Sequence, residues 1–110
     1  MTTVRAGAVP ADAQLRADIE EVKRIVLSGL GTCRARVWLF GSHARGSGGR
    51  ASDIDVAILP LEPLPAGTFA RIEEALENSL VLYPVDLVDI SSAEPALREN
   101  VERVGIPWTS

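Results

Sequence analysis

The chain has 110 residues, of which 46% are hydrophobic and 24% charged, and its 15 acidic residues outnumber 11 basic ones for a net charge of −4. A chain of this length forms one domain with its own core, and this composition excludes a disordered tail, a collagen-like repeat and a membrane-spanning protein. Proteins that bind polynucleotides usually carry a basic excess, so direct binding to nucleic acid is not expected.

The N-terminal residues and the single cysteine indicate the domain bounds, the cellular location and the absence of an internal disulfide. Residues 1–11 are small and polar and predict a flexible N-terminal arm, which leaves residues 12–110 as a single domain. The N-terminus has no apolar run long enough for a signal peptide, so we expect a cytoplasmic protein. Cys33 is the only cysteine and cannot form an internal disulfide or a thiolate metal cluster.

The first half of the domain predicts a helix and two strands. Asp12 is a suitable helix N-cap, and apolar residues follow it at helical spacing until Ser28, Gly29 and Gly31 are expected to end the helix. The inward-facing positions are Leu15, Ile19, Val22 and Val26. Residues 34–40 predict a strand inside a sheet, and residues 53–59 predict a second strand after a polar, glycine-rich segment.

The second half adds two helices and a strand. Four apolar residues lie on one face of a predicted helix, and they are Phe69, Ile72, Leu76 and Leu80. Residues 82–90 predict a third strand, and Ser92 is expected to cap a last helix that ends at Gly105. The inward positions of that helix are Leu97, Val101 and Val104. The predicted fold is α/β, with a small mixed β-sheet and helices packed on one face.

The segment between the first two strands has the composition of a phosphate-binding turn. Gly41 follows the apolar strand directly, where a residue without a Cβ allows a sharp bend and a close approach to a ligand. The hydroxyl of Ser42 and the backbone N–H groups of such a turn can donate to phosphate oxygens. Arg45 can add a charged contact to phosphate, although it can equally pair with a carboxylate of the fold.

Two aspartates begin the second predicted strand. Asp53 and Asp55 are two residues apart, so in a strand both side chains leave the same face, where their charges repel. A divalent cation shared by both carboxylates would remove this repulsion, and oxygen ligands of this kind favour Mg²⁺ or Mn²⁺. The alternative is that the strand begins one residue later and Asp53 only caps the preceding loop.

The third predicted strand supplies a further acid. Asp86 and Asp89 are three apart and face opposite ways, so at most one can join the first two aspartates. If Val85 and Leu87 pack under the helices, Asp86 projects to the other face. We therefore expect Asp86 to be the third acid and Asp89 to be a structural turn residue.

These residues carry a resemblance to a known family. Gly41-Ser42, ten intervening residues and Asp53-Ile54-Asp55 resemble the signature of DNA polymerase beta-like nucleotidyltransferases, and the Gly-Ser-His-Ala-Arg-Gly run resembles the minimal nucleotidyltransferase (MNT) family. The resemblance implies that Asp53, Asp55 and Asp86 hold two Mg²⁺ ions as the catalytic acids, with Gly41 and Ser42 on the β- and γ-phosphates. It leaves His43 without a family role, and we expect a structural or solvent-facing position for it.

The resemblance also implies a partner. Larger members of the superfamily carry extra domains that bind the acceptor, whereas few residues here follow the last predicted helix, so we expect another protein to supply the acceptor. MNT proteins resemble antitoxins that transfer AMP from ATP to a tyrosine of a HEPN-domain toxin, in a hetero-oligomeric pair. The alternatives are a non-catalytic antitoxin that neutralises its partner by complex formation, and a nucleotidyltransferase acting on a small molecule such as an antibiotic.

Overall fold

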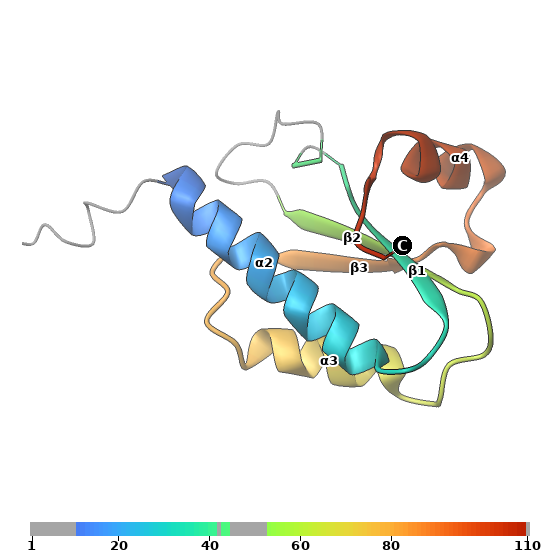
Figure 1. The fold of residues 1–110 in the computed structure, drawn as a ribbon, viewed down its shortest axis with the longest axis horizontal. Helices are drawn as coiled ribbons and strands as arrows, with labels where there is room; N and C mark the ends of the chain where they lie inside the picture. Colours follow the sequence, from blue (N-terminus) through green and yellow to red (C-terminus); the bar gives the residue numbers. More distant parts are fainter. Residues whose placement is uncertain (1–10, 42, 45–52, 110) are drawn as a thin grey trace, which may run out of the picture.

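The protein forms a four-stranded sheet with helices on both sides, as seen in a computed structural model that describes residues 11–41, 43–44 and 53–109 (Figure 1). The elements follow in the order α2 (Ala11–Leu30), β1 (Ala35–Phe40), β2 (Ile54–Pro60), α3 (Thr68–Glu77), β3 (Val85–Asp89), η1 (Ile90–Ser92), α4 (Pro95–Val104) and β4 (Ile106–Pro107). None of the helices in these ranges combines the length and apolar character that a bilayer crossing demands. Residues 1–10 of the predicted arm lie outside the described residues, and Ala11 already belongs to α2.

The sheet is mixed, as predicted, with the strand order β3-β2-β1-β4. β1 and β2 are antiparallel, with a register that runs from Ala35 opposite Pro60 to Phe40 opposite Asp55. β2 and β3 are parallel, and Ile54 lies opposite Val85. The short β4, which the sequence did not predict, extends the sheet beside β1, where Leu39 lies opposite Ile106.

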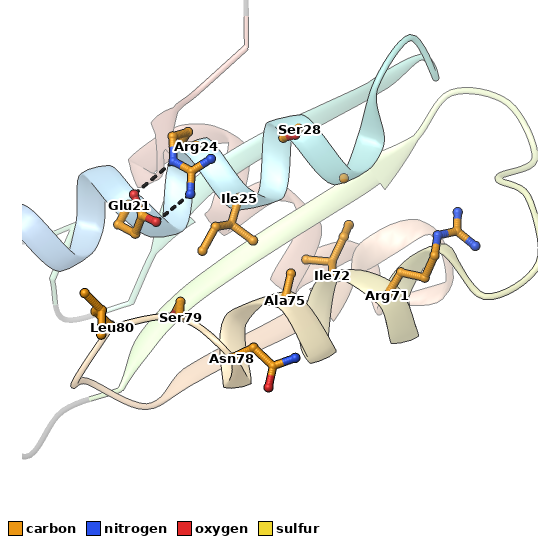
Figure 2. Close-up of a pocket in the computed structure, with 11 residues that line it drawn as sticks. Glu21, Arg24, Ile25, Ser28, Arg71, Ile72, Ala75, Asn78, Ser79 and Leu80 are labelled. Carbon is orange, nitrogen blue, oxygen red and sulfur yellow. Dashed lines mark hydrogen bonds and ion pairs between the residues drawn. The ribbon is translucent and has the colours of Figure 1, made fainter.

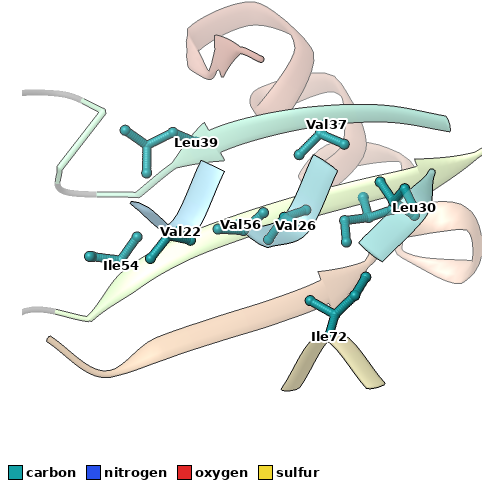
Figure 3. Close-up of a cluster of buried hydrophobic side chains, with 9 residues drawn as sticks. Val22, Val26, Leu30, Val37, Leu39, Ile54, Val56 and Ile72 are labelled. Carbon is teal, nitrogen blue, oxygen red and sulfur yellow. The ribbon is translucent and has the colours of Figure 1, made fainter. Parts of the chain in front are cut away.

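One face of the sheet carries the larger core, which α2 and α3 cover (Figure 3). This core consists of Val22, Val26, Leu30, Val37, Leu39, Ile54, Val56, Ile58 and Ile72. The side chain of Ile72 approaches α2 at Gly29, where an added Cβ would overlap it. Gly29 therefore lies inside α2 for packing reasons and does not end the helix.

The other face carries a second, smaller core. It consists of Trp38, Ala57, Leu59, Ile90 and Val101, so the single turn η1 and the helix α4 pack on this side. The mixed sheet with packed helices is confirmed, but the expectation of helices on one face holds only for α2 and α3. The physical reason is that β1 and β2 are apolar on both faces, which requires a second cover.

Several predicted element ends are wrong by a few residues. Asp12 lies within α2, which already includes Ala11, and the helix continues through Ser28 to Leu30, with Gly31 at φ +60° after it. α3 ends at Glu77, so Leu80 lies beyond the helix and is 91% exposed. Leu80 therefore does not belong to the buried face of α3, although its spacing from Leu76 is helical.

In the last third of the chain, the predicted starts of the strand and the helix also differ from the observed ones by a few residues. β3 begins only at Val85, because Pro84 precedes it and cannot donate a ladder hydrogen bond. Ser92 belongs to η1 and caps no helix; α4 follows Glu94 and has Pro95 in its first turn. Of its predicted inward positions, Val101 is fully buried and Leu97 is exposed. Gly105 ends α4 as expected.

Candidate functional site

Two of the predicted acids lie side by side in the sheet. In the parallel ladder between β2 and β3, Asp55 is directly opposite Asp86. Their strand neighbours Ile54, Val56, Val85 and Leu87 pack into the core under α2 and α3. Because side chains alternate along a strand, both carboxylates project from the opposite face, as the sequence predicted for Asp86.

Asp53 lies just before β2, because the strand begins at Ile54. The alternative, in which the strand begins one residue after Asp53, is therefore correct for the strand boundary. Asp53 is exposed just before the strand. Its charge nevertheless reaches the site, since Asp53 contributes to the raised pKa of Asp55. The structure thus brings all three acids into one electrostatic neighbourhood, with Asp55 at its centre.

The pKa of Asp55 is raised above its ordinary value. Partial burial is the largest cause, followed by the negative charges of Asp86 and then Asp53, whereas His43 lowers it. Each of the two carboxylates makes ionisation of Asp55 less favourable, so the site is poised to attract a cation. This is the electrostatic pattern that often marks functional acids.

Gly41 lies against Asp55, whereas the close approach to a ligand that the sequence predicted stays a prediction. It follows β1 directly and has φ +79°, a conformation that favours glycine. A Cβ at this position would overlap the carboxylate of Asp55. The first residue of the glycine-rich turn therefore lies against the acidic site. The other two predicted phosphate contacts, Ser42 and Arg45, lie outside the described residues.

His43 lies in the same turn and contacts the ring of Tyr83. The two ring centroids are 5.9 Å apart at an interplanar angle of 88°, an edge-to-face arrangement. This contact agrees with the structural position expected for His43. Tyr83 stands three residues before Asp86, so the contact joins the turn after β1 to the segment that enters β3.

Sequence reasoning missed one acid close to this segment. Asp18 of α2 is only 3% exposed and accepts hydrogen bonds from the backbone N–H groups of Leu82 and Tyr83 and from the side chain of Gln14. The available signal was its spacing, since Asp18 falls between Leu15 and Val22 on the buried face of the helix. An aspartate at such a position requires partners, and only the fold shows which ones.

Asp89 has the structural role that was expected of it. Its carboxylate accepts from the backbone N–H of Ser91 at 2.9 Å and from the Ser91 hydroxyl at 2.6 Å, and it caps η1. It therefore stabilises the turn after β3 and stands apart from the acidic site.

The chemistry of the acid set suits a magnesium ion. Carboxylate oxygens are hard ligands, and a cation between Asp55 and Asp86 would offset the repulsion that raises the pKa of Asp55. Among the described residues, however, no three His, Cys, Asp or Glu side chains are arranged to hold a metal ion by themselves. Mg²⁺ is commonly bound by one or two carboxylates together with substrate phosphates, so two neighbouring carboxylates such as Asp55 and Asp86 could form part of such a site.

A pocket of about 440 Å³ lies elsewhere, between α2 and α3 (Figure 2). The ion pair between Glu21 and Arg24 lies at its edge, and Ile25 and Ile72 line its floor. It contains none of the acids on the opposite face of the sheet. This pocket is therefore separate from the acidic site.

Comparison with protein families identifies a match over most of the domain. Residues 35–108 match the family described as "Polymerase beta, Nucleotidyltransferase". The matched range contains Gly41 and all three acids of the site. A protein adenylyltransferase, MntA from Shewanella oneidensis, is 40% identical over 70 residues, which are 63% of this chain and 49% of that protein. The chain thus spans about half the length of this relative.

Two solved structures are similar to this chain over most of its length. A candidate minimal nucleotidyltransferase is 32% identical, with a TM-score of 0.66 over 91% of this chain and 97% of that one. A chain from a toxin–antitoxin structure determined with AMP-PNP is 29% identical, with a TM-score of 0.62 over 86% of this chain and 72% of that one.

Proposed function

Because this chain belongs to the polymerase beta nucleotidyltransferase family, we propose that it transfers AMP from ATP to a hydroxyl group of a partner protein. The observation that carries the proposal is the placement of Asp55 opposite Asp86, with Gly41 against the Asp55 carboxylate. The similarity to MntA, a protein adenylyltransferase, supports adenylyl transfer as the reaction. A hydroxyl oxygen would attack the α-phosphorus of ATP, and the bond to the departing pyrophosphate would break.

Each residue of the site has a role in this proposal. Asp53, Asp55 and Asp86 would hold Mg²⁺, two ions in all by resemblance to the family, and the ions would neutralise phosphate charge and lower the pKa of the attacking hydroxyl. The missing Cβ of Gly41 lets the Asp55 carboxylate lie against the backbone, and the backbone N–H groups of the turn would donate to phosphate oxygens. Ser42 and Arg45 would add contacts to the phosphates, and His43 would support the turn through Tyr83.

The proposed acceptor is a tyrosine of a HEPN-type toxin, with this chain acting as its antitoxin in a hetero-oligomer. A structural relative comes from a toxin–antitoxin structure determined with AMP-PNP, which supports both ATP as the donor and a protein partner. The acidic net charge also favours a protein acceptor over a polynucleotide. A reaction that consumes ATP and modifies such a toxin would take place in the cytoplasm.

The test is the intact mass of the partner after incubation with this chain, ATP and Mg²⁺. We expect mass increments of one or more AMP groups, and we expect them to disappear when Asp55→Asn replaces the native chain. Glu73→Gln is a matched control, because it removes one exposed carboxylate from α3, outside the acidic site.

Other outcomes would change the assignment. An unmodified partner that is still neutralised by both the native chain and Asp55→Asn would indicate an antitoxin that acts by complex formation. A modified antibiotic in place of a modified protein would indicate a small-molecule nucleotidyltransferase. Either result would contradict adenylyl transfer to a toxin.

A further inference from the structure

We propose that Asp18 is a positioning residue for the acidic site, although it lies on α2 and touches none of the three site acids. The proposal rests on the function proposed above. One oxygen of Asp18 accepts from the backbone N–H groups of Leu82, at 2.7 Å, and Tyr83, at 3.0 Å. The other oxygen accepts from Gln14 Nε2 at 2.7 Å.

Asp18 anchors the backbone of this segment at Leu82 and Tyr83, while Val81 and Tyr83 also pack against the larger core. Residues 81–84 belong to no helix or strand, so their backbone N–H groups need partners outside regular secondary structure. Leu82 is 74% exposed and therefore contributes little packing. Two consecutive amide donors on one buried carboxylate oxygen fix the path of the segment in a way that an exposed leucine cannot.

The same segment is connected to the site at three points. The ring of Tyr83 contacts His43 in the turn after β1. The carbonyl oxygen of Pro84 accepts from the backbone N–H of Ile54 at 2.8 Å, between Asp53 and Asp55. Asp86 follows two residues later in β3. A shift of the segment would therefore move the turn, the start of β2 and the start of β3 together.

A small displacement at this point is costly for a reaction that depends on alignment. Groups that orient metal ligands without touching the metal typically contribute 10- to 100-fold to affinity or activity, and misplacement by about 1 Å can cost about 100-fold in rate. We therefore expect Asp18→Asn to lower the kcat of adenylyl transfer by about 10-fold or more. The amide keeps one acceptor oxygen, but this oxygen is neutral and forms weaker hydrogen bonds with the two backbone N–H groups, and the amide NH₂ group cannot accept from Gln14.

The matched control is Glu20→Gln, which removes a carboxylate from an exposed position of the same helix. We expect its kcat to stay within about two-fold of the native value. Gln14→Ala is the milder variant, because it loosens Asp18 but keeps both of its oxygens. Its effect should have the same direction as that of Asp18→Asn and be smaller, which keeps the proposal testable if Asp18→Asn does not fold.

A second readout needs no activity. The chain has one histidine and one tyrosine, so the aromatic NMR signals of His43 and Tyr83 are unique. In the native chain we expect a nuclear Overhauser effect between these rings and slow hydrogen exchange at the amides of Leu82 and Tyr83. Asp18→Asn should weaken the first and accelerate the second, whereas Glu20→Gln should change neither.

The two measurements together distinguish a positioning role of Asp18 from a purely structural one. Loss of the ring contact together with a kcat at least about 10-fold lower in folded Asp18→Asn supports the proposal. An unchanged ring contact and unchanged exchange overturn it, and so does a lost contact with native kcat, which would make Asp18 a structural residue only. If the native chain transfers nothing, the proposed function fails and the positioning role falls with it; the NMR measurement then shows only whether Asp18 holds the segment at Leu82 and Tyr83.

Discussion

The two ends of β3 carry aspartates in opposite situations. Asp89 accepts two hydrogen bonds from Ser91 and closes the turn into η1. Asp86 instead faces Asp55 across the parallel ladder and raises the pKa of that carboxyl. The hydrogen bonds of Asp89 stabilise the fold, whereas the charge repulsion between Asp86 and Asp55 destabilises it. Like charges that lie close together are typical of a site that binds a cation or a charged ligand.

The largest effect that this comparison predicts is on activity at Asp55. Asp55→Asn preserves the shape of the side chain but removes its charge, so the site loses the central acid of its proposed metal-binding set. We expect the rate of adenylyl transfer to fall by at least about 100-fold. The rate is measured by the appearance of modified partner in mass spectrometry, and a rate within ten-fold of the native one would contradict the assignment.

The second prediction concerns the glycine beside that acid. Gly41→Ala would place a Cβ against the Asp55 carboxylate at φ +79°, so we expect a loss of about 1–2 kcal/mol in the free energy of unfolding and at least about 10-fold in rate.

The matched control for this variant is Gly67→Ala. Gly67 has a similar φ of +82°, but its Cβ would meet only the end of the flexible Arg71 side chain. It should lose comparable stability in a denaturant titration and keep its rate. Equal losses of rate in the two variants would show that strain alone is responsible.

The third prediction concerns the other end of β3. Asp89→Ala removes the cap of η1, and we expect it to lower the free energy of unfolding by about 1 kcal/mol. Transfer should stay within about two-fold of the native rate, because Asp89 is not part of the acidic site. A large loss of rate in the folded variant would break the distinction between the two aspartates.

The smallest predicted effect is the pH dependence of stability. Because the pKa of Asp55 is raised in the folded protein, folding favours its protonated form. Its contribution to stability is therefore present below the ordinary carboxyl pKa of 3.8 and is lost as the pH rises through the raised value. At neutral pH, Asp55→Asn should be more stable than the native chain by about 0.5 kcal/mol.

Thermal unfolding of the two proteins across acid and neutral pH measures this difference directly. The gain in stability from Asp55→Asn should be absent at the acid end and grow toward neutrality. A variant that is less stable than the native chain at neutral pH would contradict the electrostatic account of the site.

The sequence predicted the parts of the site that depend on local geometry. Strand alternation was enough to place Asp86 on the face away from Val85 and Leu87, and the glycine after an apolar strand was enough to indicate a sharp bend at Gly41, although not its contact with Asp55. The spacing of Asp53 and Asp55 suggested one face, but β2 begins between them. A strand boundary depends on the pairing partner, which local spacing does not contain.

The features that sequence reasoning missed depend on distant parts of the chain. Asp18 finds its donors 64 and 65 residues away, and β4 exists because residues after α4 return to pair with β1. The position of α4 on the second face likewise follows from the path of the chain after β3. Helical periodicity correctly predicted buried positions such as Val22, Ile72 and Val101 but wrongly included Leu80 and Leu97. It gave no information on which face of the sheet each helix covers.

The most direct test of the central claim is an NMR titration of the Asp55 carboxyl with and without Mg²⁺ and AMP-PNP. The claim is that Asp55 and Asp86 form a binding site for a magnesium–nucleotide complex. We predict a pKa above the ordinary value for the free protein, and a clear decrease when Mg²⁺ and AMP-PNP are added together. A pKa of Asp55 that does not respond to saturating Mg²⁺ and AMP-PNP would contradict the account.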